Sequence, residues 1–414
     1  MTNENAKPQI RFAGFNDTWE QRKVGDFLTE SRIRGNTGLD AKKLTVKLWG
    51  KGVVEKNDFG GSEHTQYFVR REGQFIYSKL DFLNSAFGVI PKNLDKYEST
   101  ADLPAFDLNG MNPYFMYFTA IQEGFYLKYG SIADGSRKAK RIHANTFLEM
   151  PVNVPTLDEQ NMIVAYLHNL DRLITLHQRK YEKLHNIKKS MLEKMFPQNG
   201  SNVPEIRFKG FTDAWEQRKL GEVFETVTDY VAAGSFADLA ENVVYRDTPN
   251  YAQLVRTTDL KNGFYSGSSV YVDKKAFDFL YRVNLDKECI ILPNIGNCGE
   301  VYLVIPDDLP YKHNVLGPNA ILVRSETSDN AFLSILLQGK DFQEKLSLII
   351  SPNGQTKFNK TELKQILINM PRQSEEQHQL GAFFTNLDRL ITLHQRELEK
   401  LQNIKKSMLE KMFV

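Results

Sequence analysis

The chain has 414 residues, of which 41% are hydrophobic and 25% charged, so it is long enough for two or three ordinary domains with cores of their own. No stretch reaches the roughly eighteen apolar residues that span a bilayer. The two cysteines, Cys289 and Cys298, lie in one local stretch, which gives neither a disulfide framework nor a four-ligand metal site. We therefore expect a protein of the reducing cytoplasm that does not enter membranes. A net charge of +2 neither requires nor opposes a nucleic-acid partner.

The chain begins with a segment, the opener, that returns later. Residues 8–27 read PQIRFAGFNDTWEQRKVGDF, and residues 204–223 read PEIRFKGFTDAWEQRKLGEV, at an offset of 196. Each opener is followed by a divergent body and then by a nearly constant rod. The rods repeat at an offset of 217 and carry the identical blocks NLDRLITLHQR (169–179 and 386–396) and NIKKSMLEKMF (186–196 and 403–413). Constant segments around divergent bodies indicate one scaffold that presents two different surfaces.

Both bodies are predicted to be mixed α/β. In the first, residues 73–80, 86–91 and 106–110 are typical of strands, and residues 114–121 of a helix. In the second, we expect a buried hairpin over 288–306, a strand over 320–325 and a helix over 331–339.

Two short motifs in the bodies invite a catalytic interpretation. Asn-Pro-Tyr-Phe at 112–115 is close to a methyltransferase loop that holds a flipped base, but no glycine-rich cofactor loop precedes it, so we interpret it as a helix start. Pro306-Asp307-Asp308 lacks the further residues of a nuclease site and is interpreted as a turn that ends a strand.

Each body ends in a polar, glycine-bearing loop. The residue types in these loops suit a DNA duplex, because Lys and Arg bind phosphates and Arg, Asn and Gln make paired contacts with base edges. A solvated loop is the alternative, but recurrence at the same place in both bodies favours binding. The candidates are Arg137, Lys138, Lys140 and Arg141 in the first loop (129–143), and Gln355, Thr356, Lys357, Asn359 and Lys360 in the second (351–363).

The rods carry apolar or ring residues in steps that alternate between four and three as far as Leu184 in the first rod and Leu401 in the second, which is typical of a coiled-coil seam. The seam residues are Ile163, Leu167, Leu170, Ile174, His177, Tyr181, Leu184, Met191 and Met195 in the first rod, and Leu380, Phe384, Leu387, Ile391, His394, Leu398, Leu401, Met408 and Met412 in the second. Only residues 197–203 separate the first rod from the second opener, so antiparallel pairing of the rods needs no long return of the chain. We interpret His177 and His394 as polar residues that fix the register, in preference to metal ligands.

Some exposed rod residues are also identical in the two copies, which exceeds what a seam requires. We therefore predict that two identical outer faces dock two identical partner subunits. The residues assigned to these faces are Asn169, Asp171, Arg172 and Gln178 in the first copy, and Asn386, Asp388, Arg389 and Gln395 in the second.

The predicted fold class is α/β (α+β), with two mixed α/β bodies related by a pseudo-twofold axis and separated by a long antiparallel two-helix coiled coil. We place the first body at 1–156, the first helix at 157–197, the second body at 198–373 and the second helix at 374–414.

The pattern resembles the specificity (S) subunit of type I restriction–modification systems over nearly the whole chain. The resemblance is carried by the two WEQRK openers, the AFGVIP strand, the SPNGQTKFNKTEL loop and the LDRLITLHQRK-type rods that follow DEQ or EEQ. It implies that the bodies are target-recognition domains, each reading half of a bipartite site in double-stranded DNA, and that the helices are spacers. The first body departs from the family pattern, since GSRKAKRIH stands in place of the NGQTKFN lettering.

The resemblance also implies a non-catalytic chain that assembles with two methyltransferase (M) subunits and two restriction (R) subunits. S-adenosylmethionine, ATP and magnesium would then bind those partners, and this chain would bind no cofactor. Two alternatives stay open: a tandem coiled-coil adaptor that binds proteins without DNA specificity, and a self-contained nuclease or methyltransferase.

Overall fold

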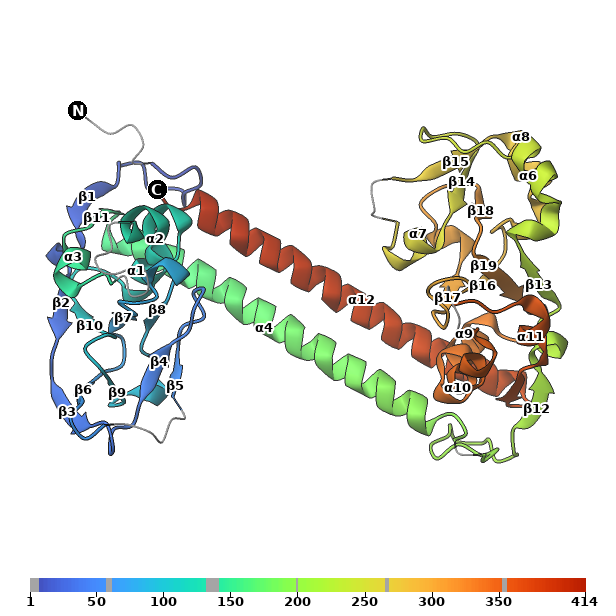
Figure 1. Ribbon diagram of the computed structural model, residues 1–414, viewed down its shortest axis with the longest axis horizontal. Coiled ribbons are helices and arrows are strands. Elements are labelled where there is room, and N and C mark those ends of the chain that lie inside the picture. Colours follow the sequence, from blue (N-terminus) through green and yellow to red (C-terminus); the bar gives the residue numbers. More distant parts are fainter. Residues whose placement is uncertain (1–6, 57–61, 132–140, 199, 265–267, 352–355) are drawn as a thin grey trace. The chain divides into compact units, whose positions relative to one another are not determined.

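The computed structural model describes residues 7–56, 62–131, 141–198, 200–264, 268–351 and 356–414. The chain divides into two compact units, one made of residues 1–178 with 396–414 and the other of residues 179–395. Each unit holds a mixed α/β body together with the start of one long helix and the end of the other (Figure 1). These helices are α4 (Leu157–Lys194) and α12 (Ser374–Lys411), each of 38 residues, which confirms both predicted rods.

Within the described residues, the first body is built from short strands and a few short helices. Its strands are β1 (Glu20–Lys23), β2 (Leu28–Ser31), β3 (Arg34–Thr37), β4 (Leu44–Val46), β5 (Val53–Glu55), β6 (Gln66–Val69), β7 (Phe75–Tyr77), β8 (Phe87–Val89), β9 (Glu98–Ser99), β10 (Ala105–Leu108) and β11 (Pro151–Val154). Its helices are α1 (Pro113–Ala120), α2 (Glu123–Gly130) and α3 (Ala144–Leu148).

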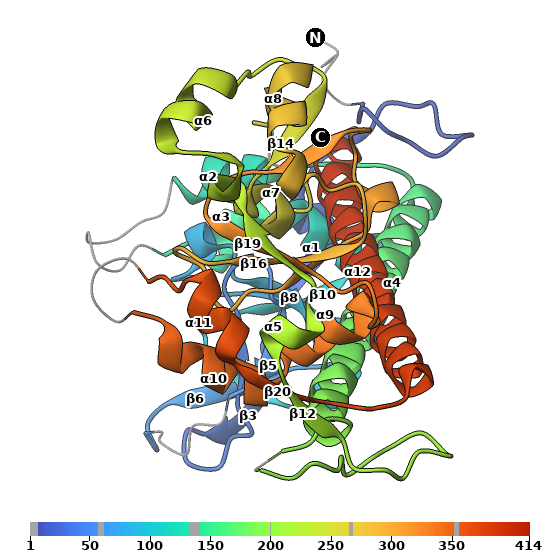
Figure 2. The same cartoon turned by 90° about the vertical axis from the view of Figure 1, so that its right-hand side faces the viewer.

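The second body, which faces the viewer in Figure 2, has fewer strands and more helices among its described residues. Its strands are β12 (Glu216–Lys219), β13 (Thr226–Asp229), β14 (Ala252–Val255), β15 (Val270–Val272), β16 (Cys289–Pro293), β17 (Tyr302–Val304), β18 (Asn314–Leu316), β19 (Ala320–Arg324) and β20 (Leu367–Met370). Its helices are α5 (Leu220–Val223), α6 (Phe236–Asn242), α7 (Thr257–Lys261), α8 (Lys274–Phe279), α9 (Asn330–Gln338), α10 (Lys340–Ile349) and α11 (Lys360–Gln365).

The two bodies share a four-stranded antiparallel sheet. The strand order is β2-β10-β7-β8 in the first body and β13-β19-β16-β17 in the second, so corresponding strands occupy corresponding places. The predicted hairpin over 288–306 is confirmed as the β16–β17 pair. Around this common sheet the bodies differ, with β3-β6-β9 and the β4–β5 hairpin in the first and the mixed sheet β15-β14-β18 in the second.

The helix that follows each sheet starts at a side-chain cap. Asn112 Oδ1 accepts hydrogen bonds from the backbone N–H groups of Tyr114 and Phe115, and Pro113 occupies the first helical position, where its missing N–H costs nothing. Asp329 caps α9 in the same way through Phe332 N. The interpretation of 112–115 as a helix start is therefore confirmed.

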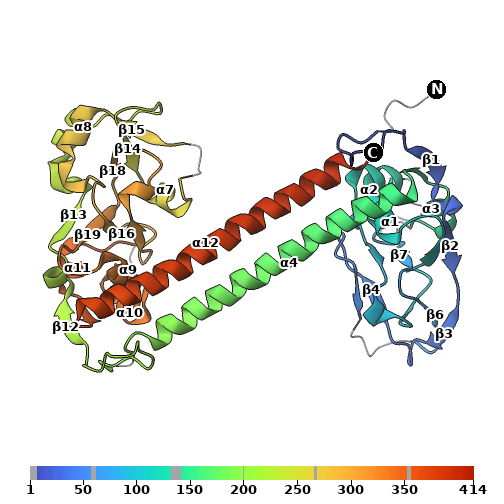
Figure 3. The ribbon, with the colours of Figure 1, turned by 180° about the vertical axis from the view of Figure 1, so that it is seen from behind.

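In each unit the long helices lie side by side and run in opposite directions, as Figures 1 and 3 show. In the first unit the start of α4 packs with the end of α12, and in the second the start of α12 packs with the end of α4. The predicted seam residues near these ends lie in the two clusters, which contain Ile163, Leu167, Leu170, Leu401, Met408 and Met412 in one unit and Leu184, Met191, Met195, Leu380, Phe384 and Leu387 in the other.

Close to each body the buried stripe of the helix is wider than a coiled-coil seam. Val164 of α4 is buried in addition to Ile163, because the body covers the helix from a second side. The equivalent position in α12 is Gly381, where a Cβ would lie 2.8 Å from Phe332 N. Glycine here lets α12 approach the start of α9 more closely than any larger residue would allow.

Candidate nucleic-acid interface

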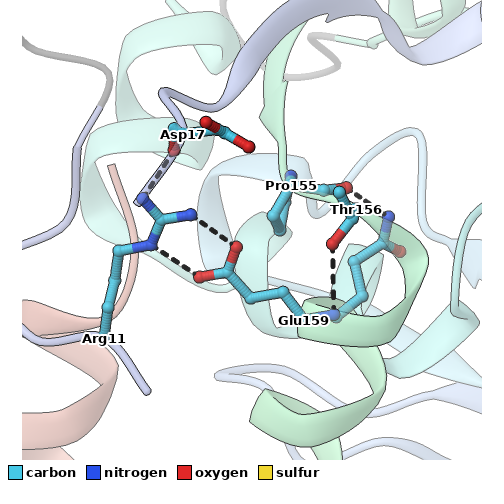
Figure 4. A network of polar contacts seen from close by, with 6 residues as sticks. Arg11, Asp17, Pro155, Thr156 and Glu159 are labelled. Atoms are coloured by element: carbon cyan, nitrogen blue, oxygen red, sulfur yellow. Dashed lines mark hydrogen bonds and ion pairs between the residues drawn. The ribbon is translucent and has the colours of Figure 1, made fainter. Parts of the chain in front are cut away.

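A buried ion pair fixes the first opener to the start of α4 (Figure 4). Arg11 Nε and Nη2 donate to the two carboxylate oxygens of Glu159 at 2.8 and 2.7 Å, and Arg11 Nη1 donates to the backbone oxygen of Asp17 at 2.5 Å. These hydrogen bonds to Glu159, whose side chain is only 1% exposed, raise the pKa of Arg11 above its ordinary value. We call this pair the first clamp.

The second unit repeats the clamp with the other long helix. Arg207 Nε and Nη2 donate to the carboxylate of Glu376, each at 2.7 Å, and Trp215 Nε1 lies 3.4 Å from the same carboxylate. Arg207 is the equivalent of Arg11 at the opener offset of 196, and Glu376 is the equivalent of Glu159 at the rod offset of 217. The same contact therefore connects each opener to its own helix.

A short strand pair continues from each clamp into the body. β1 pairs antiparallel with β11 and β12 with β20, in the same register, so that Gln21 lies opposite Asn153 and Gln217 opposite Asn369. Just before each strand a buried tryptophan packs against the end of the other long helix, with Trp19 against Phe413. The residues repeated in the two openers thus position each body on the helix pair.

The second-body loop is attached to the turn between β16 and β17. Gly296 N donates to the backbone oxygen of Thr356 at 3.0 Å, and Thr356 Oγ1 donates back to Gly296 O at 2.8 Å. Lys357 forms a β-bridge with Ile295, and the side chains of Thr356 and Lys357 are exposed. Gln355 lies outside the described residues. The loop therefore presents a hydroxyl and an ammonium group on a fixed stretch of backbone.

Two other candidates in this loop make contacts within the body. Asn359 is the N-cap of α11, where its Oδ1 accepts from Glu362 N at 2.9 Å. Lys360 Nζ is 2.8 Å from Asp229 Oδ1. These contacts give both residues a role in holding the loop, and of the four described candidates Thr356 and Lys357 are the better placed to meet a ligand.

In the first body the structure describes one of the four predicted residues. Arg137, Lys138 and Lys140 lie outside the described residues. Arg141 Nε is 3.5 Å from Asp102 Oδ1, and its side chain is 38% exposed. The following residue, Ile142, is buried, and its backbone oxygen accepts a hydrogen bond from Tyr77 Oη at 2.9 Å. Arg141 therefore stands where this loop joins the core.

The predicted docking residues on the long helices differ in their surroundings. Asn169, Arg172, Asn386 and Arg389 are exposed, whereas Gln178 is partly buried and Gln395 is exposed. Asp171 bonds Lys405 at 2.5 Å, and Asp388 bonds Lys188 at 2.6 Å.

These two ion pairs are one contact made twice, because 171 and 388, like 188 and 405, are equivalent positions in the two rods. An antiparallel pair of similar helices must repeat its contacts with the helices exchanged. The identity of Asp171 and Asp388 thus has an explanation inside the helix pair. His177 and His394 are half-buried, and their role in register stays a prediction.

One exposed residue near the first body's sheet was not among the candidates. Trp49, between β4 and β5, is 60% exposed and lies in the sequence KLWGKG. An aromatic residue flanked by lysines and glycines is a signal that the sequence does carry, and it could have been singled out.

Within the described residues, no helix combines the length and apolar character needed to cross a membrane. The same residues contain no cluster of three or more His, Cys, Asp or Glu side chains suited to a metal ion.

Comparison with known proteins gives consistent results. A family model described as type I restriction modification DNA specificity domain matches residues 16–186 and 212–403. The type I restriction enzyme MjaVIII specificity subunit of Methanocaldococcus jannaschii is 23% identical over 302 residues, covering 72% of this chain and 68% of that protein.

A solved structure that is similar over nearly its whole length shows the same fold. The S subunit of a type I restriction–modification system from M. genitalium matches 99% of both chains with a TM-score of 0.58 and 13% identity. The HsdS subunit from Thermoanaerobacter tengcongensis covers 97% of this chain and 98% of its own, with 14% identity and a TM-score of 0.46. With a specificity domain matched in each half, the chain belongs to the DNA-specificity subunit family of type I restriction–modification systems.

Proposed function

We propose that this chain reads a bipartite site in double-stranded DNA, with each body recognising one half and the paired helices setting the gap between them. One observation supports the proposal above the others: the clamp, the strand pair and the four-stranded sheet occur twice, while the segments built around them differ. A repeated scaffold with two different surfaces suits a target whose two halves differ in sequence.

For the second half-site we propose Thr356 and Lys357, with Gln355 beside them, as the residues that meet the DNA. For the first half-site we propose Arg141 together with Arg137, Lys138 and Lys140. Lysines bind phosphates and fix position, whereas the glutamine and arginines can make paired hydrogen bonds to base edges and so read sequence.

The exposed, duplicated residues of the helices are the proposed docking surface for two methyltransferase subunits. Asn169 and Arg172 would meet one subunit, and Asn386 and Arg389 the other. Two restriction subunits complete the proposed complex. S-adenosylmethionine, ATP and magnesium are assigned to those partners, and the chain itself is proposed to be a non-catalytic cytoplasmic protein.

DNA retention at graded salt concentrations tests the proposal. A protein that makes about 6–10 phosphate contacts loses roughly 10³–10⁵-fold in affinity between 50 and 200 mM salt. Lys357→Ala should weaken binding and flatten the salt dependence by about one counterion. Lys275→Ala, which removes an exposed lysine elsewhere in the same body, is the matched control and should change neither.

Equal binding by Lys357→Ala and the wild type would count against the assignment of this loop. The adaptor alternative predicts that the chain retains protein partners but no DNA at any salt concentration. Methylation or cleavage of DNA by the isolated chain would instead support the self-contained enzyme.

A further inference from the structure

Trp49 is the one tryptophan that the repeated openers do not account for. The chain has three tryptophans, and two of them, Trp19 and Trp215, are equivalent opener residues that are 4% and 3% exposed. Trp49 is 60% exposed, and the second body has no tryptophan to match it. An exposed indole that belongs to one body alone requires an explanation specific to that body.

The backbone at this position is unfavourable for a tryptophan. Trp49 has φ 60° and Gly50 φ 61°, so two consecutive residues occupy the left-handed region at the tip between β4 and β5. The connection between the paired residues Val46 and Val53 is six residues long, and at its positive-φ positions Asn and Gly are favoured because a large side chain is strained there. Residues held in such conformations cluster at functional sites. Local folding preference therefore does not explain the choice of Trp49.

The tip is also held firmly. Trp49 N donates to Asn84 O and Gly50 N to Ser85 O, each at 2.8 Å. Tyr117 Oη donates to Gly50 O at 2.6 Å. Three hydrogen bonds from two separate segments fix the backbone that carries the indole, so an aromatic contact made here would cost little ordering of the protein.

The surroundings of the indole are basic. Lys47 and Lys51 flank the tip and are both exposed, as is Leu48 at 39%. Aromatic residues interleaved with lysines suit nucleic acid, since ammonium groups meet phosphates while a ring stacks on bases or enters a base step.

A protein partner explains the tip less well. Two identical methyltransferase subunits would need the same feature in both bodies, whereas the two halves of a bipartite DNA site differ. The absence of a second-body counterpart to Trp49 therefore favours DNA as the occupant.

We propose that Trp49 is a specificity-determining DNA contact of the first body. Its indole lies against the bases at one step of the first half-site, and Lys47 and Lys51 meet the neighbouring phosphates. The inference rests on the proposed function and adds to it a contact outside the polar loops.

The test uses the full-length chain and a duplex that the wild type selects from a randomised pool. Trp49→Asn removes the ring but places at this positive φ a residue that tolerates the left-handed region, so the variant should fold normally, as checked by circular dichroism. We expect it to bind the selected duplex about tenfold more weakly, in the range found for the loss of one stacking ring. Trp49→Phe should retain most of the affinity.

Two further measurements make the test specific. Leu39→Asn removes an equally exposed apolar side chain, also at 60%, from another turn of the same body and should leave affinity unchanged. Acrylamide should quench mainly Trp49, because the other two tryptophans are buried. The selected duplex should protect Trp49 from quenching, and a duplex with only the first half-site scrambled should protect it much less.

Wild-type affinity in Trp49→Asn, or undiminished quenching of Trp49 in the complex, would overturn the inference while leaving DNA reading by the chain intact. Normal DNA binding combined with weaker retention of a methyltransferase subunit would overturn it in favour of a protein contact. A pool from which the wild type selects nothing would contradict the proposed function as well.

Discussion

Removing the arginine of a clamp should destabilise its unit strongly, and more in the first unit than in the second. Arg11→Ala leaves the carboxylate of Glu159 buried and without its two hydrogen-bond donors, a change that typically costs about 3–5 kcal/mol. In the second unit the loss is smaller for two reasons. Trp215 Nε1 stays near the Glu376 carboxylate, and Arg207 Nη1 is already buried without a hydrogen-bond partner among the described residues. We expect Arg207→Ala to cost about 1 kcal/mol less, the size of one ordinary hydrogen bond.

Hydrogen exchange followed by mass spectrometry measures both effects in one chain. Peptides covering 151–170 report on the first clamp and peptides covering 367–387 on the second, so the unaltered unit serves as an internal control. At about 1.4 kcal/mol per tenfold change, a cost of about 3–5 kcal/mol means that Arg11→Ala should speed exchange in its own unit by roughly 10²-fold to 4 × 10³-fold.

A double variant tests whether the buried unpaired charge is the cause. Arg11→Met with Glu159→Leu replaces the ion pair by apolar side chains of similar size, and exchange should return to within about tenfold of the wild type. Equal destabilisation by Arg11→Ala and Arg207→Ala, or a double variant as unstable as Arg11→Ala, would refute this reasoning.

Three further predictions follow from single features. Burial raises the pKa of the Cys289 thiol to about 12, so at pH 8 a thiol reagent should modify Cys298 but reach Cys289 only on unfolding. The backbone oxygen of Thr356 lies 3.5 Å from Cys298 Sγ, so DNA bound over Thr356 should slow the reaction at Cys298. Partial burial and nearby Asp329 raise the pKa of Glu288. The charge of Glu288 therefore opposes folding above the folded-state pKa and ceases to do so below the unfolded value of about 4.3. Glu288→Gln should raise the urea midpoint at pH 7 and leave it unchanged at pH 3.5. Each opener makes the same contact with the end of a long helix, since Ile10 N donates to Lys411 O and Ile206 N donates to Lys194 O. A circular permutant with its original ends joined and new ends within 198–203 should therefore keep the far-ultraviolet circular dichroism and the DNA retention of the wild type. Loss of either would show that the two junctions are not equivalent.

The long helices and their antiparallel pairing could be predicted because the signal lies in the letters themselves. A seam along each of two 38-residue helices, with a short connection between the first helix and the second opener, leaves few arrangements. The sequence did not reveal why Asp171 and Asp388 are identical. Their lysine partners lie on the other helix, 234 residues away along the chain for Asp171 and 200 residues away for Asp388, so the pairing could be recognised only in the structure.

Contacts between distant segments were the least predictable part of the fold. Arg11 and Glu159 are separated by 148 positions, and nothing in the sequence around either residue indicates that the two form an ion pair. The shared strand order of the two bodies was likewise hidden, because the bodies have few letters in common. The hairpin over 288–306 was predictable because both of its strands are local and apolar.

Residue type alone did not predict the structural role of every loop residue. Asn359 suits a base edge chemically, yet an asparagine that precedes a helix is also a preferred cap, and the structure places it as the cap of α11. Trp49 was overlooked because charge and amide groups guided the choice of candidates. Its strained backbone can be recognised only from coordinates.

The most direct test of the central claim is the gap between half-sites in cells that carry an altered helix pair. Seven residues inserted at equivalent points of α4 and α12, after Arg179 and Arg396, preserve the seam and lengthen each helix by about 10 Å, the rise of roughly three base pairs. Methylated adenines should then map to the same two half-sites with a gap about three base pairs longer. Methylation at the original gap would contradict the account that the helices set the distance between two readers.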